Sequence, residues 1–194
     1  MTLELVLITA VKIIILYVLY YFLIRKRKLK IDWRLALSYF ILGTWFGIAC
    51  EVFGDKIADL FQLNIWEYRV LPIHNGASSL YGPLLWSMMG LYIYVYQSFI
   101  GPSFKSKSKL VKFLAESGYL LILEFIFNLI GYLIFNGYFF YYFAPDLYHF
   151  SSFVVLPLWW GYYQVIVRLS SVFYKQEKLN IILAAVMLVI LLSE

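Results

Sequence analysis

Acidic and amide side chains at helical spacing are the residues of this chain that could do chemistry. Glu51 and Asp55 are four residues apart, as are Glu124 and Asn128, and Glu116 lies eight residues before Glu124. A helix carries residues at this spacing on one face. Two carboxylates brought close together would not both ionise readily, so they could bind a cation or act as an acid and a base.

The segments that must position these acids are strongly apolar. Hydrophobic residues make up 63% of the 194 residues, charged residues 14%, and the mean hydropathy is +0.81. An ordinary soluble domain is about half apolar and a quarter charged. Six segments have the apolar length of a membrane span: about 3–24, 34–58, 78–100, 110–135, 151–173 and 179–192. We therefore expect an all-α, polytopic membrane helix bundle, with residues 1–194 forming a single transmembrane domain.

The basic residues predict an orientation for this bundle. Thirteen of the 16 Lys and Arg residues fall in or beside the predicted loops that follow the first, third and fifth segments. The positive-inside rule places such loops in the cytoplasm. We expect a multi-pass protein of the cell membrane, with its N-terminus outside and, for six spans, its C-terminus outside as well. This topology accounts for the net charge of +5 without a nucleic-acid partner.

The middle of the chain repeats itself at an offset of 73 residues, with copies at about 38–100 and 111–173. The aligned pairs are Glu51 with Glu124, Asp55 with Asn128, Trp66 with Phe139, Tyr68 with Tyr141, Ser78-Ser79 with Ser151-Ser152 and, one residue later, Pro83 with Pro157 and Trp86 with Trp160. Parallel repeats of this kind are related by a twofold axis along the membrane normal. Such an axis would bring Glu51 and Glu124 together. The alternative is two unrelated hairpins that share Trp and Pro because membrane interfaces favour them.

Lys12 is a charge of the opposite sign that we expect inside the bilayer. It lies in the middle of the first predicted span, at a depth similar to that of Glu51. A charge inside the bilayer costs a few kcal/mol, so each one is expected to face a partner or a wet cavity. One interpretation is an ion pair between Lys12 and Glu51 or Glu124. The other is a carboxylate pair that faces a central cavity.

Aromatic residues follow each acidic helix, and they would complete a ligand site. Those expected to line it are Trp66, Tyr68, Trp86, Tyr141 and Trp160. Their faces could hold an apolar body or a cationic group. The alternative interpretation is a belt of aromatic side chains at the membrane interface.

Metal and cofactor signals are weak. His74 and His149 precede the two Ser-Ser pairs, and together with Glu51 and Glu124 they could ligate a metal, but no short-spaced ligand motif supports this. The single cysteine, Cys50, excludes a disulfide within the chain and a zinc cluster built on cysteines. No phosphate-binding loop, nucleotide fingerprint or nucleophile elbow is present, so we expect no cofactor.

Two family resemblances rest on these residues. The first copy, with Glu51, Trp66-Glu67-Tyr68 and Gly82-Pro83-Leu84-Leu85-Trp86, resembles the ABC-transporter type IV family of bacterial membrane proteins. The tandem pattern of an acid, an aromatic-x-Tyr and a proline-opened helix is also similar to the lycopene cyclase domain family. That family has acidic residues just after the proline, where this chain has Leu-Leu-Trp and Leu-Trp-Trp. These resemblances imply a membrane transport component or an enzyme that acts on isoprenoids.

Three functions therefore remain open from the sequence. The first is binding or transport of a hydrophobic or cationic small molecule at an intramembrane site of carboxylates and aromatic side chains. The second is a lipid or isoprenoid cyclase or isomerase, in which Glu51 or Glu124 would be the catalytic acid. The third is a structural subunit of a membrane complex. The expected partners are the bilayer, a lipid-like small molecule, and a second copy or another membrane subunit.

Overall fold

The computed structural model describes residues 3–25, 30–70, 72–73, 76, 78–79 and 81–192. Most of these residues are helical, which confirms the predicted all-α class. The described part of the chain contains six α-helices: α1 (Leu3–Leu19), α2 (Trp33–Leu60), α3 (Gly82–Val95), α4 (Lys109–Phe135), α5 (Leu156–Phe173) and α6 (Glu177–Leu192). π-Helical turns extend α1 and α3 as η1 (Tyr20–Arg25) and η3 (Tyr96–Ile100). Short 3₁₀ turns, η4 (Gly101–Phe104), η5 (Pro145–Leu147) and η6 (Phe153–Val155), lie in the connections.

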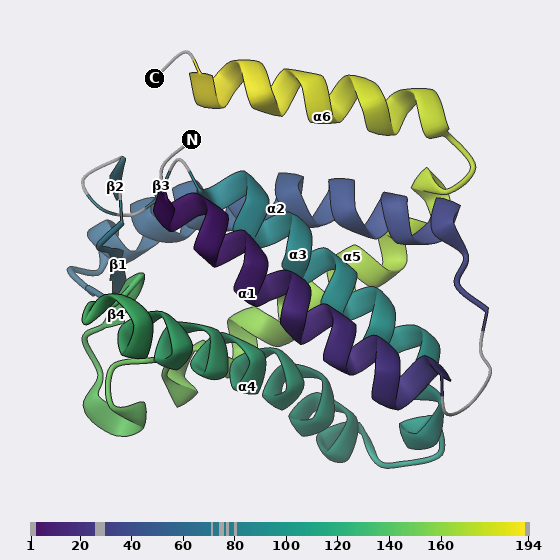
Figure 1. Ribbon diagram of the computed structural model, residues 1–194, viewed down its shortest axis with the longest axis horizontal. Coiled ribbons are helices and arrows are strands. Elements are labelled where there is room, and N and C mark those ends of the chain that lie inside the picture. Colours follow the sequence, from purple (N-terminus) through teal and green to yellow (C-terminus); the bar gives the residue numbers. More distant parts are fainter. Residues whose placement is uncertain are drawn as a thin grey trace.

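The helices alternate in direction along the long axis of the molecule (Figure 1). α1, α3 and α5 end at one end of the bundle, where α2, α4 and α6 begin; we call this the loop end. The opposite end, the strand end, carries the β-strands, the start of α1 and the end of α6 (Figure 1). α2 contacts α3, α5 and α6, while α4 packs against α5.

Two of the described helices, α2 and α4, are long and apolar enough to cross a membrane. They contain 28 and 27 residues, which at 1.5 Å per residue is roughly 40 Å each. Asp32 caps α2 by accepting a hydrogen bond from Leu35 N, and Ser108 caps α4 by accepting one from Val111 N. Both helices therefore start at polar side chains at the loop end and run to the strand end.

The starts of α3 and α5 differ from the predicted segments. α3 begins at Gly82 and α5 at Leu156, each with a proline in its first turn. Proline is favoured there because the first helical N–H groups have no partner within the helix. The Ser-Ser pairs that were expected to open these helices lie just before them and are buried: Ser78 and Ser79 form β3, and Ser152 has extended backbone.

Glycines allow α2 and α3 to approach very closely. A Cβ on Gly90 would lie 2.0 Å from Tyr39 O, and one on Gly43 would lie 2.6 Å from Trp86 O. A Cβ on Gly47 would lie 2.0 Å from Cγ of Trp86. Small residues promote this kind of packing between membrane helices. The result is that the Trp86 indole lies on Gly47, one helical turn before Glu51.

Short strands at the strand end connect the two predicted hairpins. β1 (Trp66–Tyr68) pairs antiparallel with β4 (Phe140–Tyr142), so that Trp66 faces Tyr142, Glu67 faces Tyr141 and Tyr68 faces Phe140. We call this pair the β1–β4 ribbon. A second pair joins β2 (Pro72–Ile73) to β3 (Ser78–Ser79). The sequence did not predict these strands.

Candidate functional site

Glu51 is buried on α2 and accepts three hydrogen bonds. Its side chain is 1% exposed. Oε1 accepts a hydrogen bond from the Tyr68 hydroxyl. Oε1 also accepts one from Trp86 Nε1, at 2.5 Å, and Oε2 accepts one from Ser78 Oγ, at 2.5 Å. The three donors come from β1, α3 and β3, so the carboxylate ties α2 to the first hairpin's loop and return helix.

Glu124 on α4 is held by the same three types of donor. Its Oε1 accepts from the Tyr142 hydroxyl at 2.6 Å. Its Oε2 accepts from Ser151 Oγ at 2.5 Å and from Trp159 Nε1 at 3.2 Å. When the carboxyl group is ionised, each such hydrogen bond is about twice as strong as a neutral one. Each hairpin therefore contains a carboxylate fixed by one tyrosine, one serine and one tryptophan.

At two positions, the donor to Glu124 is the residue next to the one that the predicted repeat aligns. Tyr142, not Tyr141, contacts Glu124, because successive residues of β4 point to opposite faces of the strand. Trp159, not Trp160, contacts Glu124. Trp160 is one residue further around α5, and its Nε1 donates to Glu116 at 3.1 Å.

A cavity of about 270 Å³ lies between the two carboxylates. Glu51, Glu124 and Lys12 are its charged walls, and the remaining walls are almost entirely apolar. The aromatic walls are Phe53, Trp66, Tyr68, Trp86, Tyr92, Phe127, Phe140, Tyr142, Trp159 and Tyr162. This volume and lining are typical of a site for a small apolar ligand with a few fixed polar contacts.

Lys12 of α1 reaches the same cavity but forms no direct ion pair with either carboxylate. Among the described residues, its Nζ donates to Leu85 O at 2.9 Å and lies 4.5 Å from the centre of the Phe127 ring. Phe127 is on α4, three residues from Glu124, so Lys12 contacts the helix that carries Glu124. Lys12 therefore shares the cavity with Glu51 and Glu124 without a direct ion pair to either one.

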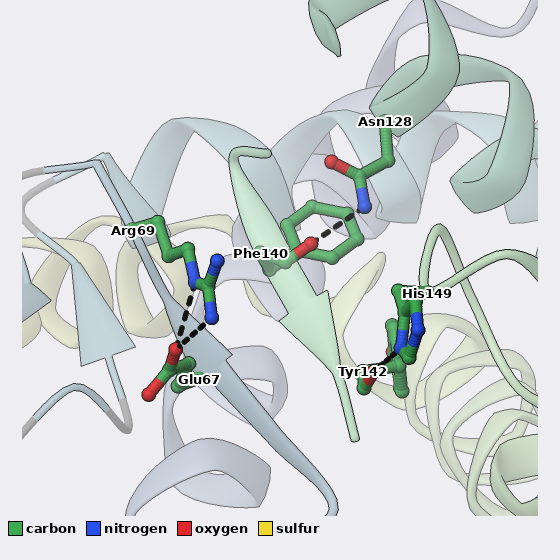
Figure 2. A network of polar contacts seen from close by, with 6 residues as sticks. All are labelled: Glu67, Arg69, Asn128, Phe140, Tyr142 and His149. Carbon is green, nitrogen blue, oxygen red and sulfur yellow. Dashed lines mark hydrogen bonds and ion pairs between the residues drawn. The ribbon is translucent and has the colours of Figure 1, made fainter. Parts of the chain in front are cut away.

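Asn128 supports the site without lining it. Its Nδ2 donates to Phe140 O at 2.6 Å and to Phe150 O at 3.1 Å, and its Oδ1 accepts from Phe139 N at 3.1 Å. Figure 2 shows the first of these contacts, from α4 to the β4 backbone. Because Tyr142 is on the same strand, Asn128 fixes the strand that delivers a donor to Glu124.

The residues predicted to bind a ligand thus divide into two groups. Those that line the cavity are Glu51, Glu124, Trp66, Tyr68 and Trp86, and those that lie elsewhere are Asp55, Asn128, Tyr141 and Trp160. Tyr142, Trp159 and Tyr162 also line the cavity but were not predicted. The sequence predicts Ser78 and Ser151 only as matching positions of the repeat, and in the structure each donates to the carboxylate of its own copy.

Tyr68 and Tyr142 are suited to their role as donors. Both phenols are buried, and burial, followed by the adjacent carboxylate, raises the pKa of each well above its usual range. A phenol that stays protonated can keep its O–H directed at the carboxylate. The two tyrosines therefore present O–H groups, not negative charges, to Glu51 and Glu124.

The outer face of the β1–β4 ribbon carries a separate polar cluster (Figure 2). Arg69 forms an ion pair with Glu67 at 2.7 Å and lies 3.9 Å above the Tyr141 ring. His149 stacks on Tyr141, and its Nδ1 is 2.6 Å from Tyr142 O. Because a carbonyl oxygen can only accept, this nitrogen carries the proton.

The metal hypothesis gains no support from the described residues. Within them, no group of three or more His, Cys, Asp or Glu side chains is placed to hold a metal ion. His149 contacts the ribbon and not Glu124. His74 lies outside the described residues.

Comparisons with protein-family profiles, with curated proteins and with solved structures found no match. The two family resemblances seen in the sequence therefore stay predictions, and the function has to be argued from the site itself.

Proposed function

We propose that this chain is an integral membrane protein that binds a hydrophobic cation in the cavity between Glu51 and Glu124. The observation that carries the proposal is that two buried carboxylates, from α2 and α4, line one cavity whose other walls are mostly aromatic.

Charge balance favours a positively charged ligand. The cavity has two carboxylates and one ammonium, Lys12, so its walls have an excess of one negative charge when all three groups are ionised. Lys12 is already engaged by Leu85 O and the Phe127 ring. An uncompensated charge in a low-dielectric interior costs several kcal/mol. A bound cation would neutralise the excess, whereas an anion would increase it.

The aromatic walls favour an organic cation over a metal ion. The rings of Trp86, Trp159 and Tyr162 form a cluster with centroids 5.0 to 5.8 Å apart. Ring faces attract ammonium groups, and aromatic cages recognise alkylated ammonium ligands in this way. The same rings also exclude water, so a small hydrated metal ion would have to lose its water ligands to enter the cavity.

The surface of the helices supports a membrane location. Large apolar side chains are exposed along them, for example Ile13 and Ile14 on α1, Phe53 on α2, and Leu133 on α4. A soluble protein rarely leaves so much apolar surface in water. We propose that all six helices cross the bilayer, with the second and third pairing as one copy of a repeat and the fourth and fifth as the other.

The basic residues give this arrangement a direction. Lys105 and Lys107 precede α4 and Lys175 precedes α6, all at the loop end of the bundle. The positive-inside rule assigns this end to the cytoplasm. The strand end, with the ribbon and the start of α1, would then face outwards.

The proposed function is tested by titrating the purified protein in lipid nanodiscs with dodecyltrimethylammonium, and in parallel with dodecyl sulfate, which has the same tail and the opposite charge. Calorimetry should show saturable binding of the cation, with at least about tenfold weaker binding of the anion. Empty nanodiscs correct for partition into lipid. Equal binding of both detergents, or no saturable binding of the cation, would contradict the proposal.

A further inference from the structure

The cavity does not end at the carboxylates. Beside the buried Glu51, its walls include Phe53 and Ile57 of α2 and Leu158 of α5. Phe53 is 65% exposed and Leu158 is 52% exposed, so these residues lie at the surface of the bundle. The cavity therefore runs from the charged centre to an opening between α2 and α5.

This opening faces sideways and is apolar. Phe53 and Ile57 lie in the last two turns of α2 and Leu158 in the first turn of α5, so the opening is between these helices towards the strand end. Gly54 also lines the cavity, and a side chain there would meet only the rim of the Trp66 ring at 3.5 Å. We call the set Phe53, Gly54, Ile57 and Leu158 the lateral opening. If α2 and α5 cross the bilayer, the lateral opening faces hydrocarbon.

Among the described residues of the strand end, the ribbon covers the cavity. Tyr68 and Tyr142 close that end of the cavity, since each donates a hydrogen bond from the ribbon to a carboxylate. Asn128 holds β4 in place, and Arg69 stacks on Tyr141 above it. A ligand that entered past the ribbon would have to break these contacts. A ligand that entered through the lateral opening would break no hydrogen bond of the ribbon.

We infer that the ligand is a membrane-dissolved amphiphile with a cationic headgroup and a single alkyl tail, and that its tail leaves the cavity through the lateral opening. This inference rests on the proposed function and names its substrate class. The headgroup lies between Glu51 and Glu124, against the rings of Trp86 and Trp159. The tail passes Leu158 and Phe53 into the lipid, so the bilayer solvates the part of the ligand that the cavity cannot hold.

Spin labels at the lateral opening test the inference. Leu158→Cys and Ile122→Cys are made in a Cys50→Ala background and labelled with a nitroxide in nanodiscs. Ile122 is the control because it is 56% exposed, lies two residues from Glu124 and does not line the cavity. Both labels should collide more often with oxygen, which dissolves in lipid, than with a water-soluble nickel chelate.

Addition of dodecyltrimethylammonium should then remove most oxygen collisions at the Leu158 label and leave the Ile122 label unchanged. Tetramethylammonium, which has the headgroup and no tail, should leave both labels unchanged. If the cation binds by calorimetry but the Leu158 label does not respond, or if that label collides mainly with nickel, the lateral opening is wrong and the cation site stands. If the cation does not bind at all, the cation site itself is wrong, and the inference fails with it.

Discussion

Glu67 of β1 lies directly opposite Tyr141 of β4 in the antiparallel ribbon. A local twofold axis through this pair relates the residue after each of them, Tyr68 to Tyr142, and these two tyrosines donate to Glu51 and Glu124. The register of the ribbon therefore places one tyrosine donor at each of the two carboxylates. The ribbon is the element that joins the two halves of the site.

The ribbon tyrosines should matter for stability. Tyr142→Phe removes the hydrogen bond to Glu124 and leaves a buried carboxylate with one fewer donor, which should lower the free energy of unfolding by about 1–3 kcal/mol. Tyr68→Phe should have a similar effect through Glu51. Thermal unfolding in mild detergent measures both.

Tyr119→Phe is the matched control for these variants. Among the described residues, the Tyr119 hydroxyl is buried without a hydrogen-bond partner. Its removal should leave the melting temperature unchanged or raise it slightly. An equal loss of thermal stability in all three variants would show that the hydrogen bonds to Glu51 and Glu124 do not account for the effect of Tyr68 and Tyr142.

Gly47 should not tolerate a side chain. A Cβ at this position overlaps the Trp86 ring, so Gly47→Ala must push the indole away from Glu51. Overpacking of a core costs about 1–3 kcal/mol, and the lost donor adds to that. The measurement is again thermal unfolding, together with a change in Trp fluorescence.

The opposite result is expected at two other helical glycines. A Cβ on Gly118 of α4 or on Gly161 of α5 meets nothing within 4 Å. Alanine is the better helix former, so Gly118→Ala and Gly161→Ala should each be neutral or stabilising by up to about 1 kcal/mol. Destabilisation in these controls as large as in Gly47→Ala would argue against the packing of α2 on α3.

Lys12 should be coupled to Glu124 more than to Glu51. The Lys12 ammonium group contacts Phe127 on the same helix as Glu124, so in a double-mutant cycle on stability Lys12→Met and Glu124→Gln should deviate from additivity by about 0.5–3 kcal/mol. The cycle with Glu51→Gln should be additive within about 0.5 kcal/mol. Stronger coupling to Glu51 would contradict the placement of the Lys12 ammonium group.

The orientation can be measured with reporter fusions. A fluorescent-protein fusion truncated after Ser106, between η4 and α4, should be fluorescent, because that loop is expected in the cytoplasm. An alkaline phosphatase fusion truncated after Ala144, just after β4, should be active because it is exported. The reverse pattern would mean that the positive-inside assignment is wrong for this chain.

The sequence predicted those features that depend on periodicity and composition. The apolar segments, the helical class and the pairing of Glu51 with Glu124 in one cavity all follow from spacing that can be read along the chain. The ribbon could not be predicted in the same way, because strands of three residues are fixed by tertiary contacts such as Asn128 to Phe140 O. The offset of 73 residues pairs Tyr68 with Tyr141, but in the ribbon it is Tyr142 that points towards Glu124.

The close packing of α2 on α3 was also missed. Gly43 and Gly47 are four residues apart, and this spacing is a known signal for close contact between membrane helices. The partner, Gly90, could not be assigned from sequence because the signal does not say which helix lies opposite. Lys12 shows the same limit: its depth was predicted, but the choice of Leu85 O over a carboxylate depends on how α1 lies against α3.

The most direct test of the cation site is the binding of dodecyltrimethylammonium to carboxylate variants in nanodiscs. Glu51→Gln and Glu124→Gln should each weaken binding at least about tenfold, and the protein should bind one cation. Glu116→Gln is the control, because Glu116 bonds to Trp160 and Gln164 and does not line the cavity. Unchanged affinity in both Glu51→Gln and Glu124→Gln, in protein that remains folded, would contradict a cation site between these two carboxylates.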